Sequence, residues 1–462
     1  MTATVLIIGA GFSGAITAVQ LLRQARGRPL RVILLNRGGR MARGLAYGTH
    51  SPDHTLNVPA GNMSAFDDAP EHFLDYCRAR DAATAAATFV SRRRYGDYLE
   101  HLLTQAERSP AGAARLDHLT GEVTQLQASA GPAGLLATLA DGRTLRADRV
   151  ILAFGHFPSA HPPLADMGFY NSARYVRDPW TPDWLARLPP GAPVLLLGTG
   201  LTAVDICMSL LNDDPGRPIV AISRRGLLPQ HHRLSHAMPP AGAGPLAIWG
   251  GATTVRAQLR ALRRHVAAGL AHGRDWRDAL ASLRPHTAAI WQAWPERERR
   301  RFLRHVQPYW DSHRHRLAPQ VHQRFAAAIA NGTVRIQAAR VRAMTDDGSQ
   351  VEVVLKPRGA TAETTLRVAA VINCTGPCSS PRATASALVD QLLAQGMLQA
   401  DTLGLGVRVA PDCAVLDAAG QPSSTLYYIG PWLKADHWEA TAVPELRRYA
   451  ARLAATILAS LD

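Results

Sequence analysis

The chain has 462 residues, 47% of them hydrophobic, with a formal net charge of +15 at pH 7. Nearly all basic residues are arginines spread along the chain, with only Lys356 and Lys434 as lysines, and no nucleic-acid-binding motif accompanies them. No apolar run reaches the roughly 20 residues of a membrane helix, no secretory signal precedes the first strand, and five cysteines lack regular spacing. We therefore expect a soluble cytoplasmic protein of two or three domains with reduced thiols, binding neither nucleic acid nor membrane.

The first informative motif is the turn Gly9-Ala10-Gly11-Phe12-Ser13-Gly14, between a strand expected at 4–8 and a helix expected at 15–26. Glycines at this spacing let the backbone approach a dinucleotide pyrophosphate, and the helix N-terminus supplies N–H donors. The next strand, expected at 31–36, ends in Asn36, followed by Arg37. An acid is usual at this position, but the amide oxygen of asparagine still accepts a hydrogen bond from the adenosine ribose.

A second turn, Gly198-Thr199-Gly200-Leu201-Thr202-Ala203, follows the apolar run 194–197 and precedes another helix. The strand expected at 218–223 leads into Arg224-Arg225. Two guanidinium groups at this position favour the 2′-phosphate of NADPH over NADH. Two such turns in one chain predict two dinucleotides, a bound flavin and a nicotinamide that reduces it.

The remaining segments predict an α/β protein with two Rossmann-like dinucleotide-binding domains. The FAD-binding domain is expected at 1–160 and 370–462, and the NAD(P)H-binding domain at 161–369, with a helical insertion at about 245–330. Within these domains we expect helices at 70–80, 95–107 and 439–461, short strands over 119–150, and strands at 333–356, 369–373 and 425–429. Two strands end in a glycine-containing turn, at 151–156 and 371–376.

Four further segments carry a family resemblance: 44–47, 56–66, 70–74 and 438–447. Together with the first turn they resemble a bacterial family of FAD/NAD(P)-binding proteins related to class B flavin monooxygenases. Members of that family include a urate hydroxylase and amino-acid N-oxygenases. The resemblance covers nearly the whole chain and implies FAD in the first site, NAD(P)H in the second and O2 as co-substrate. It also implies oxygen transfer through a flavin C4a-hydroperoxide.

The motifs and the resemblance together assign the cofactor-binding residues. Those for FAD are Gly9, Gly11, Phe12, Ser13, Gly14, Asn36, Arg37, Asn57, Met63, Ser64, Val123, Gly155, Gly376, Gly430, Trp438, Glu439 and Thr441. Those for NADPH are Gly198, Gly200, Leu201, Thr202, Ala203, Arg224 and Arg225. The resemblance places the N-terminus of the last helix, near Trp438, at the flavin pyrimidine ring, where its dipole stabilises the reduced anion.

The catalytic acid or base stays open at this level. Asn57, Ser64, His232 and Trp438 are the candidates. His231, His232 and His236 either contact nicotinamide or substrate or are structural, and the structural role is favoured for all three. No compact ligand spacing indicates a metal. The pair Cys374 and Cys378 is better explained as packing than as a redox dithiol.

The helical insertion contains Trp276, Trp291, Trp294, Tyr309 and Trp310, and it is either a substrate-facing element or a lid or dimer contact. Arg314 and Arg316 either meet an anion or form a solvated helix face. The sequence does not fix the oligomeric state, a homodimer included.

These patterns lead to one functional hypothesis and two alternatives. The leading hypothesis is an FAD-dependent, NADPH-consuming monooxygenase that hydroxylates a small nitrogen-containing metabolite. The first alternative is an FAD-dependent NAD(P)H oxidoreductase that inserts no oxygen. The second is a redox-sensing flavoprotein.

Overall fold

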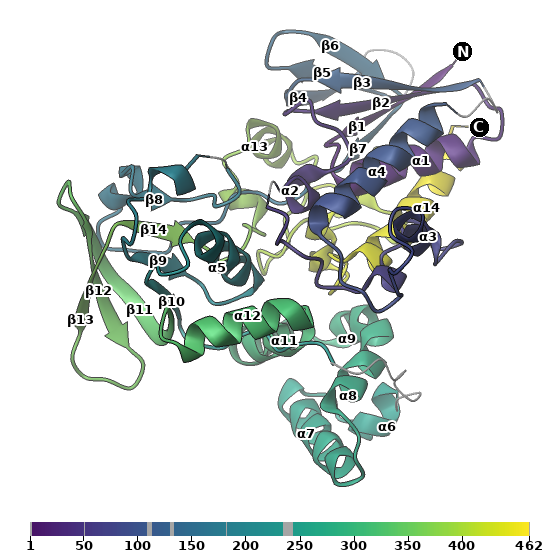
Figure 1. Ribbon diagram of the computed structural model, residues 1–462. Helices are drawn as coiled ribbons and strands as arrows, with labels where there is room; N and C mark the ends of the chain where they lie inside the picture. The colour runs from purple at the N-terminus through teal and green to yellow at the C-terminus, as the bar shows by residue number, and fades with distance from the viewer. Residues whose placement is uncertain are drawn as a thin grey trace.

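The computed structural model describes residues 2–49, 51–108, 113–129, 134–181, 183–233 and 244–461. Two mostly parallel sheets lie side by side, with a group of helices below them in the view of Figure 1. The first sheet has the strand order β15-β16-β7-β1-β2-β3, in which only β15 is antiparallel to its neighbour. Its strands are β1 (Ala3–Ile8), β2 (Leu30–Asn36), β3 (Ala114–Thr120), β7 (Arg149–Leu152), β15 (Ala414–Leu416) and β16 (Pro422–Tyr428).

Helices from both ends of the chain pack together beside the first sheet. The first helix, α1, meets both α4 and the C-terminal α14, and the three lie together in Figure 1. Apolar residues of α1 and α14 join the strands in one hydrophobic core; α1 is buried on all sides over its first ten residues, whereas α14 buries one face. The helices of this domain are α1 (Phe12–Gln24), α2 (Gly44–Tyr47), α3 (His72–Arg78), α4 (Arg92–Glu107), α13 (Ala387–Ala394) and α14 (Val443–Ala459).

A small antiparallel sheet is attached to the first domain. It has the order β4-β5-β6 and consists of β4 (Val123–Ala128), β5 (Leu135–Leu139) and β6 (Thr144–Ala147). The side chain of Gln391 in α13 bonds to both backbone groups of Leu126, at 3.0 and 2.9 Å, which holds α13 against β4.

The second sheet has the order β13-β12-β11-β10-β9-β14-β8. Its strands are β8 (Tyr175–Val176), β9 (Val194–Leu197), β10 (Ile219–Ser223), β11 (Val334–Asp346), β12 (Val351–Pro357), β13 (Thr364–Val368) and β14 (Ala370–Asn373). The central strands are parallel, whereas β12 and β13 form an antiparallel extension. One face is covered by α5 (Leu201–Asp213) and α12 (Pro319–Ala330), whose apolar residues share one core with β9 and β10.

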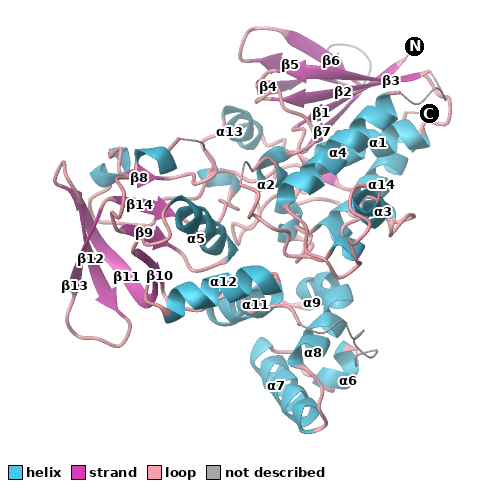
Figure 2. Ribbon diagram, in the orientation of Figure 1, coloured by secondary structure: helices cyan, strands magenta, loops and turns pink. Residues whose placement is uncertain are grey.

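The described residues between β10 and β11 form helices and no strand of either sheet (Figure 2). These helices are α6 (Pro245–Trp249), α7 (Val255–Ala271), α8 (Trp276–Leu283), α9 (Thr287–Ala293), α10 (Glu296–Arg301), α11 (Gln307–Arg314) and α12. Between α10 and α11 lies the π-helix η5 (Phe302–Val306), a rare conformation that is frequent at functional sites.

The structure corrects one expected domain boundary. Ala370–Asn373 was expected to open the returning part of the first domain, but β14 lies between β9 and β8 in the second sheet. The strand that pairs with the first sheet is β16, through its parallel contact with β7. An apolar strand pairs equally well in either sheet, so its sequence could not distinguish them.

The last helix also begins later than expected. A helix was expected from residue 439, but α14 starts at Val443 with Pro444 in its first turn, a position that proline favours. The preceding residues form the short 3₁₀ helix η7 (Pro431–Ala435) and a loop. Residues 436–442 therefore form a loop where a regular helix was expected.

Candidate cofactor and substrate site

The first glycine turn leaves no room for side chains at two of its positions. Gly9 has φ +108°, in the left-handed region, and its N–H donates to the Leu35 carbonyl at 2.9 Å. A β-carbon on Gly9 would lie 2.5 Å from the Ala153 carbonyl oxygen, and one on Gly14 would lie 1.9 Å from the Gly9 carbonyl oxygen. The backbone can therefore turn tightly into α1 and present the N-terminal N–H groups of that helix.

The second turn repeats this geometry in the other sheet. Gly198 has φ +121° and donates to the Ile222 carbonyl at 2.7 Å. A β-carbon on Gly198 would lie 2.4 Å from the carbonyl oxygen of Cys374. Around Gly200 no atom lies within 4 Å of an added β-carbon, which leaves open space at the N-terminus of α5. Both turns thus offer a glycine-lined helix start of the kind that accepts a pyrophosphate.

The end of β2 keeps one acceptor available. The Asn36 side-chain amide donates from Nδ2 to the Arg40 carbonyl at 2.5 Å, and no hydrogen bond is made by its Oδ1 atom within the described residues. Arg37 is exposed and lies 3.5 Å from Glu122. The free amide oxygen is positioned at the strand end, as the predicted ribose contact requires.

Two arginines follow β10, and they differ in their contacts. Arg225 donates from Nη2 to the Arg304 carbonyl at 3.0 Å, and its guanidinium lies 5.8 Å from the Tyr309 ring. Arg224 is exposed and has no hydrogen bond or ion pair within the described part of the chain. The insertion therefore orients one arginine through η5 and leaves the other free for an anion.

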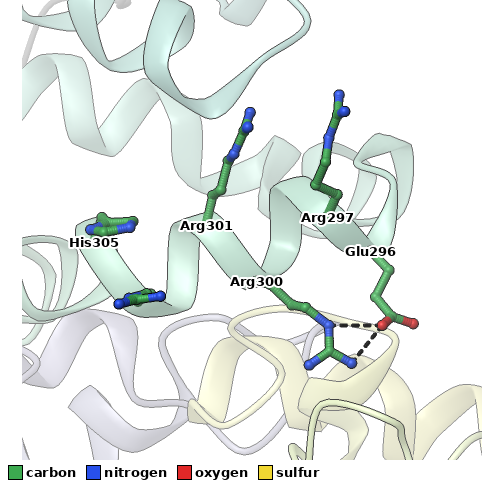
Figure 3. Close-up of a pocket in the computed structure, with 6 residues that line it drawn as sticks. Glu296, Arg297, Arg300, Arg301 and His305 are labelled. Carbon is green, nitrogen blue, oxygen red and sulfur yellow. Dashed lines mark hydrogen bonds and ion pairs between the residues drawn. The ribbon is translucent and has the colours of Figure 1, made fainter.

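A surface cavity of about 500 Å³ lies on α10 and η5. Arg297 and Arg301 point to one side of the helix, whereas Arg300 turns away from them toward Glu296 (Figure 3). Arg300 and Glu296 form an ion pair at 2.6 Å, and Glu296 also accepts from the Thr402 hydroxyl at 3.0 Å. The remaining lining residues are Arg304 and His305. The cavity is open and basic, and it lies on the same element that contacts Arg225.

In the loop expected at the flavin, some candidate side chains are buried or already hydrogen-bonded, and one has an unused polar group. Met63 is buried in the first core. The Ser64 hydroxyl donates to the Ala69 carbonyl at 2.6 Å and accepts from the Phe66 N–H at 3.1 Å, so it is used within its own turn. Asn57 is half-buried, its side-chain amide has no bond within the described residues, and its carbonyl accepts from His232 Nε2 at 2.9 Å. Of the loop candidates, Asn57 keeps a free polar group.

His232 joins the two domains through this bond. It follows β10, whereas Asn57 belongs to the first domain. Desolvation, followed by the positive charge of Arg316, lowers the pKa of His232 to about 4. The ring is therefore neutral at physiological pH and donates from Nε2 to the Asn57 carbonyl. His236 lies outside the described residues.

The segment around Trp438 packs against the helical insertion. The Trp438 ring stacks on Trp291 of α9, with centroids 4.7 Å apart, and meets Phe302 edge-on at 5.1 Å. Lys434 lies 4.3 Å above the same ring. The three aromatic rings belong to a separate apolar cluster between the insertion and the first domain. Of the five insertion aromatics, Trp291, Trp294 and Trp310 thus pack in this cluster, whereas Trp276 and Tyr309 lie outside it.

Glu439 holds the same junction by charge. It has φ +73°, a left-handed conformation uncommon for residues other than glycine, and its side chain is 4% exposed. Trp310 Nε1 donates to one carboxylate oxygen at 2.7 Å, and Arg314 Nε lies 2.7 Å from the other. A bidentate pair of Arg284 and Glu445, at 3.0 Å for both bonds, adds a second link. The strained backbone at Glu439 is held by contacts from α11.

The other residues assigned to FAD are a threonine, a valine and three glycines, which differ in their backbone contacts and in the space around them. Thr441 N–H donates to the Glu439 carbonyl at 2.6 Å, and Val123 begins β4 with its side chain in the core. A β-carbon on Gly430, at φ +153°, would lie 2.6 Å from the Tyr428 hydroxyl oxygen. Around Gly155 and Gly376 an added β-carbon would meet nothing within 4 Å. These two strand-end glycines therefore leave space beside each turn.

Titratable groups missed by the sequence analysis lie near the aromatic cluster. Desolvation and the charge of Lys434 lower the pKa of His156 to about 4. Asp311 Oδ1 lies 3.7 Å from His315 Nε2; desolvation raises the pKa of Asp311 and lowers that of His315. Desolvation also lowers the pKa of Lys434. These groups come from the segment after β7, from α11 and its C-cap residue, and from η7, so no local sequence pattern could have brought them together.

The five cysteines are all free and buried. Burial raises the pKa of Cys77 to about 11 and that of Cys413 to about 12, and it raises the pKa values of Cys207 and Cys374 further. A reactive thiolate needs a lowered pKa and access. No pair here has the properties of a redox dithiol.

Comparisons with known proteins define the first domain and the fold. Residues 6–157 match the model of a family described as FAD-NAD(P)-binding. This match confirms the predicted resemblance to FAD/NAD(P)-binding proteins in the first part of the chain. No curated protein matches the chain.

Three solved structures match over nearly the full length of both chains. An ornithine N-hydroxylase from Kutzneria sp. 744, with reduced FAD, NADP+ and L-ornithine, has a TM-score of 0.66 at 16% identity, covering 100% of each chain. The reduced form of an ornithine hydroxylase from Pseudomonas aeruginosa has a TM-score of 0.65 at 14% identity, also covering 100% of each. An L-lysine 6-monooxygenase from Pseudomonas syringae has a TM-score of 0.64 at 14% identity, covering 99% of each. The predicted α/β fold class is confirmed, and the chain has the fold of these hydroxylases.

Two features are absent from the part of the chain that the structure describes. No helix there is long and apolar enough to cross a membrane. No group of three or more metal-ligating side chains occurs in the same residues.

Proposed function

We propose that this protein is an FAD-dependent, NADPH-consuming monooxygenase that hydroxylates a small nitrogen-containing metabolite with O2 as co-substrate. The observation that carries the proposal is the full-length likeness to two ornithine hydroxylases and a lysine monooxygenase. The two glycine turns support it, because each ends at a helix N-terminus with room for a pyrophosphate.

The residues present fit both cofactors. At the first turn Gly9 and Gly14 tolerate no β-carbon, and Asn36 Oδ1 is free for the ribose of FAD. At the second turn the space around Gly200 suits the pyrophosphate of NADPH, and Arg224 and Arg225 suit its 2′-phosphate. The NADPH assignment rests on these two cations, since NADH would favour an acid after β10.

When bound, FAD accepts a hydride from the nicotinamide and activates O2, which is chemistry that side chains cannot supply. The chain's own residues position and enclose the reaction. His232, uncharged at neutral pH, fixes the Asn57 carbonyl and so holds the loop of the first domain against the second. The cluster of Trp291, Phe302 and Trp438 excludes water between the insertion and the first domain.

Proton handling falls to groups at the same junction. Asp311 and His315 face one another at 3.7 Å, with opposite pKa shifts that bring both toward their neutral forms. Because burial disfavours the charged form of each group, a proton can be held on either of them. His156 is neutral and can accept a hydrogen bond.

Labelled dioxygen separates this proposal from a flavin reductase or a redox sensor. The purified protein should contain FAD, and a primary amine among a panel of amino acids and diamines should accelerate NADPH oxidation while its hydroxylated product acquires one labelled oxygen atom. NADH at equal concentration is the control and should be slower. Peroxide formed one-for-one with NADPH under every amine would contradict oxygen insertion and favour the reductase. The buried cysteines already make electron transfer to a disulfide the weaker alternative.

A further inference from the structure

The helical insertion contains a group of arginines whose charges are not all balanced. Arg233 lies 3.0 Å from Asp275 and also pairs with Asp278. Arg277 lies 3.2 Å from Asp275 and donates twice to the His231 carbonyl, at 3.0 and 2.7 Å. The two aspartates of α8 and its N-cap are therefore already shared by two arginines.

Two arginines that follow one another closely in sequence differ in their partners. Arg314 is compensated by Glu439 at 2.7 Å. Arg316 is half-buried and makes no hydrogen bond or ion pair within the described residues. The Nε atoms of both arginines are inaccessible and make no hydrogen bond of good geometry, so the difference between them is the carboxylate that lies beside Arg314 and not beside Arg316. Four arginines thus share three carboxylates, and the charge left over belongs to Arg316.

An unpaired guanidinium in this position is costly to the folded state. Desolvation, followed by repulsion from Arg314 and Arg277, lowers the pKa of Arg316 to about 10, so the side chain remains charged at neutral pH. A partly desolvated charge without a partner destabilises a protein, and such groups persist where a ligand supplies the partner.

Arg316 also lies where the parts of the molecule meet. Its neighbour Leu317 donates to the Gln230 carbonyl at 2.8 Å and accepts from His232 N–H at 3.0 Å. The side chain of His232 reaches Asn57, in the loop that we expect at the flavin. The ring of Trp276 lies 6.0 Å from the Arg316 guanidinium. The free cation therefore stands between the insertion, the segment after β10 and the first domain.

We propose that Arg316 is the substrate's anion-binding residue, taking a carboxylate or phosphate group carried by the small metabolite. That the bound molecule is the substrate rests on the proposed function, whereas the anion-binding site itself does not depend on it. A guanidinium binds either group through two parallel N–H···O bonds, which fixes the orientation of the bound molecule. The three paired arginines supply a positive field without competing for the anion.

The first test measures anion binding directly. The FAD-loaded protein, saturated with NADP+ so that the pyrophosphate sites are filled, is titrated with acetate and with inorganic phosphate at constant ionic strength in a calorimeter. Wild type should show saturable binding of at least one of the two anions. Arg316→Gln should weaken it at least about tenfold, and Arg316→Lys should retain part of it. Arg263→Gln, which removes an exposed arginine of α7, is the matched control and should bind as wild type does.

Folding of the variant is checked by its melting temperature. Because Arg316→Gln removes an uncompensated charge, its Tm should equal or exceed that of wild type. Unchanged affinity in Arg316→Gln, or no saturable binding of either anion by wild type, would overturn the proposal.

The second test assigns the anion to its source. The dissociation constant for NADP+ should be the same in wild type and Arg316→Gln. A tenfold weaker binding of NADP+ in the variant would place a cofactor phosphate at Arg316 and overturn the proposal. Labelled-oxygen incorporation is scored separately, so failure of the monooxygenase hypothesis would leave the anion-binding result readable.

Discussion

The two glycine turns share one geometry at their first position and differ at their third. Gly9 and Gly198 both have a positive φ, and each faces a carbonyl oxygen of a neighbouring strand end, that of Ala153 or Cys374. At the third position the first turn has Gly14, whereas the second has the buried Ala203. The first helix thus lies too close to its turn for any β-carbon, and the second helix leaves room for a methyl group.

The strand ends beside the turns differ in charge. β2 ends at Asn36, which is neutral, while β10 is followed by Arg224 and Arg225. Equivalent positions in the two units therefore offer an uncharged acceptor in one and two cations in the other. The comparison indicates that the backbone turn creates a general pyrophosphate site, and the strand-end side chains select the nucleotide.

Exchanging the third residue of each turn should have the largest effect. Gly14→Ala places a β-carbon 1.9 Å from the Gly9 carbonyl oxygen, so α1 must shift; we expect a loss of about 3 kcal/mol or more in unfolding free energy, together with loss of FAD. Ala203→Gly should cost only about 1 kcal/mol. Urea unfolding and flavin absorbance measure both. A Gly14→Ala protein with wild-type FAD content and stability would contradict the comparison.

Removing the cations of the second unit should alter nucleotide choice. The double variant Arg224→Gln, Arg225→Gln should raise the dissociation constant for NADPH by about 10- to 100-fold, the effect of lost charged hydrogen bonds, and change that for NADH little. Fluorescence titration of both nucleotides gives the comparison. Arg37→Gln, the matching change in the first unit, is the control. Equal losses for NADPH and NADH would show that the pair does not recognise the 2′-phosphate.

The contact that joins the two units should depend on pH. His232 has its pKa lowered to about 4, so between about pH 6.5 and 4 the unfolded chain binds a proton that the folded chain does not. Stability therefore falls as pH drops through this window, with about 2 kcal/mol from His232 by pH 5. Urea midpoints at about pH 7 and 5 should show a smaller decrease in His232→Gln than in wild type. Because His156 is shifted in the same direction, part of the decrease should persist. An identical pH dependence in both proteins would contradict the assignment.

Replacing Asn36 with the acid that is usual at the end of this strand should have the smallest effect. Asn36→Asp offers a carboxylate to the ribose of FAD but loses the Nδ2 bond to the Arg40 carbonyl, so FAD binding should tighten by less than about 1 kcal/mol. The rate of FAD release on dilution measures it. Faster release would show that the turn at 36–40 matters more than the ribose contact.

Much of the fold could be predicted from local sequence. The glycine turns, the apolar strands before them and the helical insertion each depend on short-range patterns, and the structure has strands and helices at those places. The two strand ends at 151–156 and 371–376 were also visible, although only the structure brings the carbonyls of Ala153 and Cys374 against the first glycines. The sheet membership of Ala370–Asn373 could not be predicted, since an apolar strand carries no label for its partner.

The candidate site was less predictable. Trp438 and Glu439 were assigned to FAD by resemblance, and whether they also touch the cofactor stays a prediction. Their observed contacts with Trp291, Trp310 and Arg314 depend on how an insertion more than a hundred residues away packs. Ser64 was a candidate by its position in a loop, yet its hydroxyl is used by that loop. Such contacts follow from tertiary packing and leave no local signature.

The sequence by itself determined the two helix starts, because glycine spacing and flanking apolar runs act over a few residues. It could not distinguish Arg314 from Arg316, since both are arginines in the same polar run. Only the tertiary structure decided that Arg314 has Glu439 beside it, whereas Arg316 has no carboxylate partner among the described residues. The physical reason is that charge compensation depends on carboxylates brought from distant parts of the chain, whereas a backbone turn depends on its own residues.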